Sequence, residues 1–279
     1  MAWHLTGSPD EFWSAAGEFL RSRPVENSLP LTLTDTLRKR NLHYYGADDP
    51  LFGWYEAAGH VQGACLQTPP HPLIMAGAPA EALPELASLL ADRPLPGVNA
   101  LTADAEAFVD VWRRLTGADV TVGKQTRLFR LDVLTPPSPL PPGAPRVAGA
   151  ADRDLLVDWL TAFHQELGEH IGDPVRTADD KIAYGGLTLW EVDGYPVSLA
   201  GVTRPEAGVA RVAPVYTPSD QRARGYAGAA TSAVTQAALD AGADDVVLFT
   251  DLANPTSNAL YQRLGYRPIE DRVVMRFGA

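Results

Sequence analysis

The chain reads Val212-Ala-Pro-Val-Tyr-Thr-Pro-Ser-Asp-Gln-Arg-Ala-Arg-Gly-Tyr-Ala-Gly228 in its second half. This stretch predicts a strand, a short turn and a loop, Arg222-x-x-Gly225-x-Ala227, from which a helix begins. The first N–H groups of a helix lack an intrahelical acceptor, and the helix macrodipole adds partial positive charge there. The small residues of the loop let a phosphate approach the backbone, while Arg222 and Arg224 add cationic donors. The stretch therefore predicts a phosphate or pyrophosphate site.

The residues around this loop predict an α+β arrangement. A helical stripe of apolar residues runs from Asp152 to about Leu167, and a second short helix covers residues 180–184. Residues 187–192 and 196–202 flank Asp193-Gly194, which predicts a β-hairpin. The further predicted elements are strand 210–216, helix 225–240, strand 246–250, helix 255–264 and strand 273–277. Three antiparallel strands framed by helices indicate a mixed sheet.

The first half of the chain repeats much of this layout. Its predicted elements are the hairpin 51–56 and 60–67, strand 73–75, helix 81–90, strand 98–101, helix 103–115 and strand 126–134. Between the halves, residues 135–146 contain six prolines and one glycine, which disfavours a helix or a central strand. We therefore predict two domains, residues 1–134 and 148–279, joined by a linker at 135–147.

Composition narrows the class of protein. The 279 residues carry a net charge of −11, which argues against a nucleic-acid or anionic-membrane partner. Cys65 is the sole cysteine, so we expect no intrachain disulfide, no cysteine-based metal site and a buried, unreactive thiol. No apolar run approaches the ~20 residues that span a bilayer. The first residues lack the pattern of a signal peptide, so we expect a cytoplasmic protein. We also expect no metal cofactor.

The second half, residues 148–279, resembles the GCN5-related N-acetyltransferases, the GNAT family. Three features carry the resemblance: Arg222-x-x-Gly225-x-Ala227 after a strand, then Asn254-Pro-Thr-Ser-Asn-Ala-Leu-Tyr261-Gln-Arg-Leu-Gly-Tyr266, then a closing strand. The resemblance implies a fold of two tandem GNAT-like domains, each with a mixed, mostly antiparallel sheet flanked by helices. Over residues 1–134 the likeness is one of layout only.

The resemblance also implies the cofactor and the residues that hold it. The anion would be the pyrophosphate of acetyl-CoA, and the pantetheine arm would lie along the strand like an added strand, where a splayed edge tolerates Pro214. Asn254 would bind the cofactor, cap its own helix, or do both. The implied cofactor-binding residues are Val215, Tyr216, Thr217, Arg222, Ala223, Arg224, Gly225, Tyr226, Ala227, Gly228, Asn254 and Tyr261.

The implied chemistry is direct transfer of the acetyl group to an amine. The backbone N–H of Val215 would bind the developing oxyanion, and the phenol of Tyr261 would protonate the leaving thiolate. Many relatives carry a glutamate four residues before the Val215 position, whereas this chain has Arg211. His164 and Glu191 are the first candidates for the general base. Glu166, His170, Asp251 or an ordered water are the alternatives.

Other residues fit either a structural or a functional role. The aromatic residues Trp159, Phe163, Tyr184 and Trp190 could line an acceptor pocket, although we expect them in the core. In the first half, Ala76-Gly-Ala-Pro-Ala-Glu81 stands where a phosphate loop would be needed. Pro79 removes a donor and Glu81 would repel phosphate, so we interpret this half as a degenerate domain without an acyl-CoA site.

Four functions remain open. The first is an N-acetyltransferase that acts on an amine of a small molecule, and the second is an acetyltransferase for a protein amine. The third is a non-catalytic acyl-CoA-binding module in which Arg211 marks the loss of the base. The fourth is a small-molecule transferase that uses the same fold with another acyl-CoA. The sequence does not distinguish a monomer from a homodimer, and the fold alone does not decide among the functions.

Overall fold

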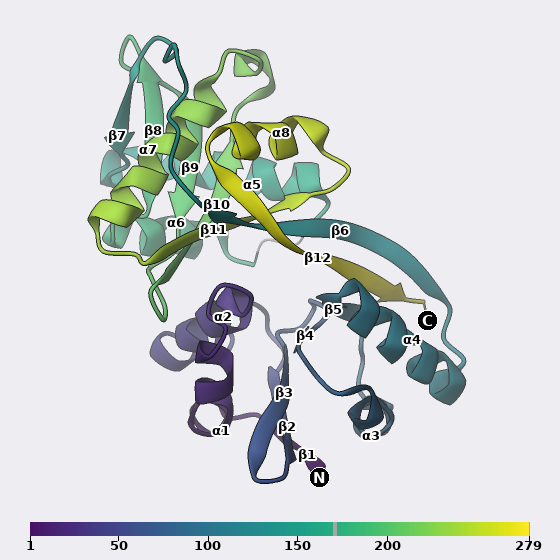
Figure 1. Ribbon diagram of the computed structural model, residues 1–279. Helices are drawn as coiled ribbons and strands as arrows, with labels where there is room; N and C mark the ends of the chain where they lie inside the picture. Colours follow the sequence, from purple (N-terminus) through teal and green to yellow (C-terminus); the bar gives the residue numbers. More distant parts are fainter. Residues whose placement is uncertain (170–171, 279) are drawn as a thin grey trace. The chain divides into compact units, whose positions relative to one another are not determined.

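The chain follows the same order of elements twice, β-α-α-β-β-β-α-β-α-β, in the computed structural model, which describes residues 1–169 and 172–278 (Figure 1). The first half comprises β1 (Ala2–Thr6), α1 (Pro9–Arg21), α2 (Ser28–Lys39), β2 (Leu51–Ala57), β3 (His60–Gln67), β4 (Leu73–Ala76), α3 (Leu83–Leu90), β5 (Gly97–Leu101), α4 (Thr102–Thr116) and β6 (Val120–Leu131).

The second half comprises β7 (Ala144–Val147), α5 (Arg153–Leu167), α6 (Pro174–Ala183), β8 (Leu187–Val192), β9 (Tyr195–Val202), β10 (Val209–Tyr216), α7 (Tyr226–Asp240), β11 (Asp245–Asp251), α8 (Pro255–Arg263) and β12 (Tyr266–Phe277). Short 3₁₀ turns precede α3, α5 and the loop before α7. The α+β class and the repeated layout agree with the prediction. Elements β1, α1, α2 and β7 do not appear among the predicted ones, and α6 begins six residues earlier than the predicted residue 180.

Two compact units contain these elements. Unit 1 consists of Met1–Leu128, Asp251–Ala253 and Glu270–Ala279, and unit 2 of Phe129–Thr250 and Asn254–Ile269. Unit 1 therefore includes most of β12, the last strand of the chain. The predicted functional boundaries at residues 134 and 148 stay a prediction.

Each unit contains a mixed, mostly antiparallel set of strands. In unit 1, β1, β2, β3 and β4 pair antiparallel in sequence order, β4 pairs parallel with β5, and β5 pairs antiparallel with β12. In unit 2, β7, β8, β9 and β10 pair antiparallel in sequence order, and β10 pairs parallel with β11. The parallel pair takes the same place in both halves.

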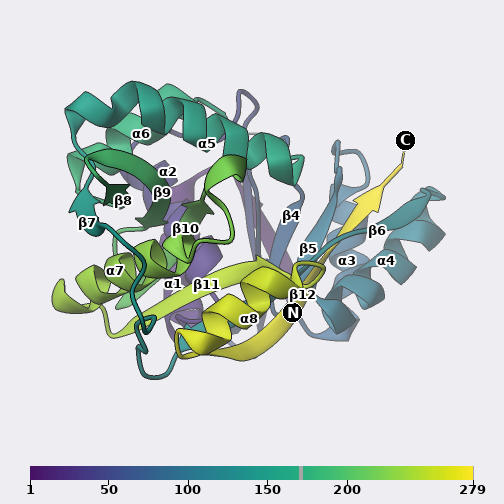
Figure 2. The same ribbon diagram turned by 90° about the horizontal axis from the view of Figure 1, so that it is seen from above.

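Helices cover both faces of the strands in unit 2, as Figure 2 shows. On one face, Leu156 and Leu160 of α5 pack with Leu187, Leu189 and Leu199 of the sheet. On the other face, Ala230 and Val234 of α7 pack with Ala200, Ala210 and Val212. Since side chains alternate along a strand, the intervening residues of β10 (Arg211, Ala213) belong to the α5 and α6 face.

Candidate active site

The site begins where β10 and β11 separate. Their parallel ladder joins Val209, Ala210 and Arg211 to Asp245, Val246 and Val247, and in the described residues it extends no further. On its other side β10 pairs with β9, but the register shifts between Val212 and Val215. Beyond Arg211, one edge of β10 thus lacks a strand partner, as the prediction of a splayed edge requires.

A loop with left-handed backbone follows β10 and leads into α7. Ala223 has φ 61° and Gly225, the N-cap of α7, has φ 85°. The first helical bond runs from Ala229 N to Gly225 O at 3.1 Å, so the N–H groups of residues 226–228 point out of the helix end. The first turn of α7 has no acidic residue. Backbone N–H groups in this conformation form a concavity that suits an anion.

Arg222 connects this loop to the end of β10 and to helix α5. Its Nε donates to Thr217 O at 2.8 Å, and its Nη2 donates to both carboxylate oxygens of Glu166 on α5 at 2.7 Å. The guanidinium and the carboxylate are each about half exposed, at 47% and 48%. Arg224 donates to Asp220 O at 3.0 Å. Arg222 therefore shapes the loop, and Glu166 is already paired with a cation.

Helix α8 contributes Tyr261, and Asn254 is its N-cap residue. The side-chain oxygen of Asn254 accepts from Ser257 N at 3.0 Å, which confirms the capping role. Tyr261 is 8% exposed and lies in the apolar cluster that contains Tyr226 and against which Val215 packs. Burial raises the pKa of Tyr261 to about 12, so the phenol is protonated at neutral pH. No described group hydrogen-bonds its hydroxyl.

Residues of the proline-rich linker adjoin the start of α7, which the sequence does not predict. A Cβ placed on Gly225 would lie 3.7 Å from Pro141 Cβ, and one on Gly228 would lie 3.6 Å from Pro137 Cγ. Pro137 and Pro141 are half-buried, whereas Pro136, Pro139 and Pro142 are exposed. In Figures 1 and 2 the teal linker passes close to α7 and α8. The linker is thus a neighbour of the predicted pyrophosphate loop.

The two leading candidates for the general base differ in their surroundings. His164 is half-buried on the last turn of α5, and its Nδ1 lies 2.8 Å from Leu160 O. Because a carbonyl only accepts, Nδ1 must donate, so the neutral imidazole carries its lone pair on Nε2. His164 can therefore accept a proton at Nε2. His170 lies outside the described residues.

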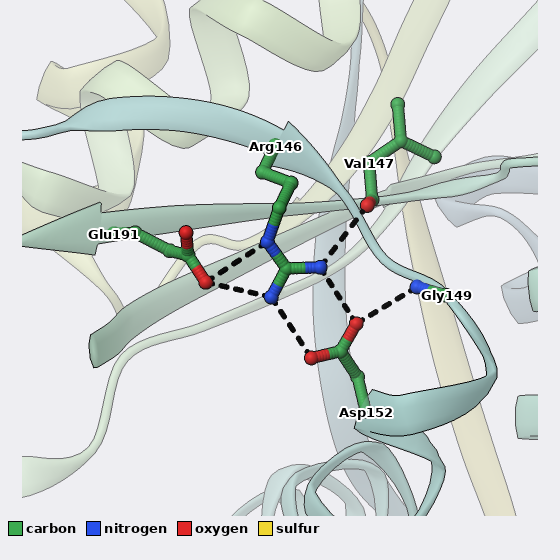
Figure 3. A network of polar contacts seen from close by, with 5 residues as sticks. All are labelled: Arg146, Val147, Gly149, Asp152 and Glu191. Atoms are coloured by element: carbon green, nitrogen blue, oxygen red, sulfur yellow. Dashed lines mark hydrogen bonds and ion pairs between the residues drawn. The ribbon is translucent and has the colours of Figure 1, made fainter. Parts of the chain in front are cut away.

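Glu191 belongs to an ion-pair network at the β7 edge of unit 2 (Figure 3). Its Oε1 accepts from Arg146 Nε at 2.9 Å and Nη2 at 2.6 Å, and the same guanidinium binds both oxygens of Asp152 at 2.7 and 2.9 Å. The Asp152 and Glu191 carboxylates raise the pKa of Arg146, and the Arg146 guanidinium holds the pKa of Asp152 below its usual range. The Glu191 carboxylate is thus already engaged by a cation in this structure.

Part of the chain is similar in sequence to a known protein family. Residues 153–266 match the sequence model of the Acetyltransferase (GNAT) family. This segment is a GNAT acetyltransferase domain. The family supports acyl transfer as the general activity, and no curated protein matches the chain significantly.

Solved structures extend the likeness over the chain. A GNAT acetyltransferase from Colwellia psychrerythraea is 12% identical with a TM-score of 0.63, and all of both chains is covered. A GCN5-related N-acetyltransferase from Sphaerobacter thermophilus is 13% identical with a TM-score of 0.66, covering 99% of this chain and 95% of that one. A tandem GNAT protein from the clavulanic acid biosynthesis pathway is 12% identical with a TM-score of 0.58, covering 99% and 98%. At these identities the likeness supports the fold.

Of the aromatic residues in the GNAT domain, some are buried in the core and others lie near the end of β10. Trp190 is 3% exposed and donates to Pro142 O at 2.9 Å, as expected for a core residue. The ring of Trp159 lies 5.9 Å from that of Tyr216, at the end of β10. Phe163 stacks edge-on with His164. Burial, and then the Glu166 carboxylate, raise the pKa of Tyr216.

Unit 1 differs from the GNAT domain at the corresponding place. Its parallel ladder joins Leu73 and Ile74 of β4 to Val98 and Asn99 of β5. Beyond this ladder, Arg272 Nη2 of β12 donates to Met75 O at 2.8 Å and is 3.4 Å from Asn99 O. The 8%-exposed Arg272 side chain thus binds the backbone where β4 leaves its ladder. Cys65 is buried here, as predicted, and burial raises the pKa of its thiol to about 12.

In residues 1–169 and 172–278 no group of three or more His, Cys, Asp or Glu residues could hold a metal ion. None of the helices within those residues is both long and apolar enough to cross a membrane.

Proposed function

We propose that the GNAT domain transfers an acetyl group from acetyl-CoA directly to an amine of a small molecule. The observation that carries the proposal is the juxtaposition at the end of β10. There a strand edge without a partner continues into the left-handed loop and the open N-terminus of α7. An extended amide chain that ends in a pyrophosphate complements these two features, because the first needs ladder bonds and the second needs negative charge.

In this proposal the pyrophosphate accepts hydrogen bonds from the backbone between Ala223 and Gly228. The pantetheine amides pair with Val215, Tyr216 and Thr217. Arg222 and Arg224 add positive charge at the loop, and Asn254, the N-cap residue of α8, borders the arm. Residues 222–225 are exposed, which supports this role because a ligand can approach them without a change of the helix.

The chemistry needs an oxyanion donor, an acid and a base. As the amine nitrogen attacks the thioester carbon, the carbonyl oxygen becomes negative and the N–H of Val215 stabilises it. The C–S bond then breaks, and Tyr261 gives its phenolic proton to the thiolate. The proton of the attacking nitrogen passes to His164 Nε2 or to water. Glu191 stays a candidate for this role only if Arg146 releases it.

Arg211 favours one alternative, the non-catalytic acyl-CoA-binding module, because it removes the usual carboxylate from β10. A protein amine is the second alternative as acceptor. The proposed arrangement assigns acyl transfer to residues 148–279, one acyl-CoA site to the whole chain and the degenerate role to residues 1–134. The proposed location is the cytoplasm, which fits a chain with one cysteine.

Calorimetric titration with acetyl-CoA tests the cofactor site. We expect about one site per chain, and we expect Arg222→Glu to weaken binding by roughly 10-fold or more, because it places negative charge beside the pyrophosphate and repels Glu166. Arg114→Glu on α4, an exposed arginine of unit 1, is the matched control and should bind as the wild type does. Unaltered binding by the Arg222→Glu variant would contradict the site.

An acceptor screen tests the reaction. Release of free CoA thiol is followed with acetyl-CoA and a panel of small amines, amino sugars and amino acids, then with lysine-containing peptides. Turnover with a small amine supports the proposed acceptor class, and turnover with peptides alone supports a protein amine. Tight binding of acetyl-CoA without turnover on any acceptor supports the binding module.

A further inference from the structure

The β-bulge in β10 presents backbone oxygens of two strands to a neighbouring helix. Val212 pairs with Val202 and Val215 with Ala200, so Ala213 and Pro214 together face Gly201. Pro214 has no N–H, and the carbonyl of Ala213 projects over Gly201, where a Cβ would lie only 2.7 Å from that oxygen. The bulge therefore needs glycine opposite, and its Ala213 carbonyl can accept from a donor outside the ladder.

Helix α6 supplies that donor. Lys181 Nζ donates to Ala213 O at 3.1 Å and lies 3.5 Å from Val202 O, while Tyr184 Oη donates to Val202 O at 2.8 Å. The lysine thus joins β9 and β10 across the register shift. Its contact with Ala213 is two residues from Val215, the proposed oxyanion donor.

We propose that Lys181 is a positioning residue for acyl transfer, which fixes the bulge of β10 and thereby aims the N–H of Val215 at the acyl oxygen. This inference rests on the proposed function of Val215. A preorganised donor stabilises a transition state only if its direction is fixed before the reaction. The bulge is the place where β10 would otherwise relax, because the ladder is interrupted on the β9 side and has already ended on the β11 side.

The charge around Lys181 is compatible with this role at any ordinary pH. Burial, then Arg211 on β10 and Arg204 beyond β9, lower the pKa of Lys181 to about 8. Arg204 itself lies 3.9 Å from the ring of Tyr184. A neutral amine still has two N–H donors, one for each carbonyl. The positioning effect should therefore be the same on both sides of pH 8, whereas a lysine acting as a base would matter only above it.

Lys181→Met tests the proposal, because methionine keeps the length of the side chain and removes its donors. We expect kcat to fall by about 10- to 100-fold, from the loss of alignment of one donor, with acetyl-CoA affinity within about two-fold of the wild type. The fold-loss should be equal at pH 7 and pH 9. Lys181→Arg, which restores donors, should recover much of kcat. Lys39→Met on α2 is the control for loss of a lysine and should leave kcat unchanged.

The amide resonance of Val215 and the melting temperature complete the test of Lys181. The amide resonance of Val215 in ¹⁵N-labelled protein should shift in Lys181→Met and not in Lys39→Met, whether or not an acceptor is known. Thermal melting shows whether the variant is folded. A folded Lys181→Met variant with wild-type kcat or an unmoved Val215 resonance would overturn the inference. If the wild type binds no acetyl-CoA, the proposed function fails, and a shifted Val215 resonance still supports the link between Lys181 and the bulge.

Discussion

At the scale of the residue, Tyr261 is the proposed acid for the leaving thiolate. Its ring is buried in the cluster beneath the end of β10, and in the described residues its hydroxyl donates to no protein group. The high pKa of Tyr261, about 12, keeps the proton on the phenol until a thiolate takes it. A thiolate of ordinary pKa, about 8.5, is a much weaker base than the phenolate that would form. Proton transfer from Tyr261 to the thiolate therefore costs free energy unless cofactor binding lowers the pKa of the phenol.

We expect Tyr261→Phe to lower kcat by about 100-fold while acetyl-CoA affinity stays within a few-fold, because the phenol acts on the leaving group. Since the raised pKa keeps Tyr261 protonated far above neutrality, the wild-type kcat should show no alkaline decrease from this group between pH 6 and 10. Steady-state CoA release across this range measures both. Tyr195→Phe, at a 75%-exposed tyrosine, is the matched control. A Phe variant with more than half of the wild-type kcat would exclude Tyr261 as the acid.

Residues of the proposed acyl-CoA site are easier to predict from sequence than residues that would bind the acceptor amine. Gly225, Arg222 and Tyr261 stand in short motifs whose spacing follows from one helix start and one helix face. Lys181 stands in no motif, because its proposed role depends on a bulge 32 residues further along the chain. The pairing of Glu191 with Arg146 has the same origin, since antiparallel β7 and β8 bring them together.

At the scale of the element, the linker behaves as part of the GNAT domain. Pro137 and Pro141 adjoin the glycines at the start of α7, and proline restricts the linker before any ligand binds. Replacement of both by serine should raise the KM for acetyl-CoA by roughly 3- to 10-fold through lost preorganisation, with kcat nearly unchanged. Pro139→Ser in the exposed part of the same linker is the control. Equal KM values for the two variants would mean that the linker is a simple connector.

Local sequence predicts some elements and misses others for physical reasons. The β8–β9 hairpin follows from Asp193-Gly194, both of which have positive φ. Strand β7 lies within a proline-rich stretch, which is tolerated because only one of its edges is paired, with β8. The start of helix α1 could have been predicted, because Ser8 is a typical N-cap residue and Pro9 is favoured at the first helical position. The pairing of β5 with β12 joins strands far apart in the sequence, which no local pattern encodes.

At the scale of the whole molecule, the last strand stabilises the first unit. Val273 and Met275 of β12 are buried in the core of unit 1, whereas Ile269 on the same strand is 44% exposed in unit 2. Met275→Ala should lower the free energy of unfolding by about 2–5 kcal/mol, from lost burial and a cavity. Ile269→Ala should change it by less than about 0.5 kcal/mol. Urea titration followed by circular dichroism measures both, and equal midpoints would argue against this role of β12.

The membership of β12 in unit 1 also bears on synthesis in the cell. Residues 1–128 leave the ribosome long before residues 270–279, and the delay is on the order of 10 s at ordinary rates of translation. Throughout that interval the edge of β5 from Gly97 to Leu101 lacks its antiparallel neighbour. Such an edge invites pairing with other nascent chains. Unit 1 is thus the first to be translated and the last to be completed. We therefore expect the yield of native protein to depend on slow growth or on the supply of chaperones.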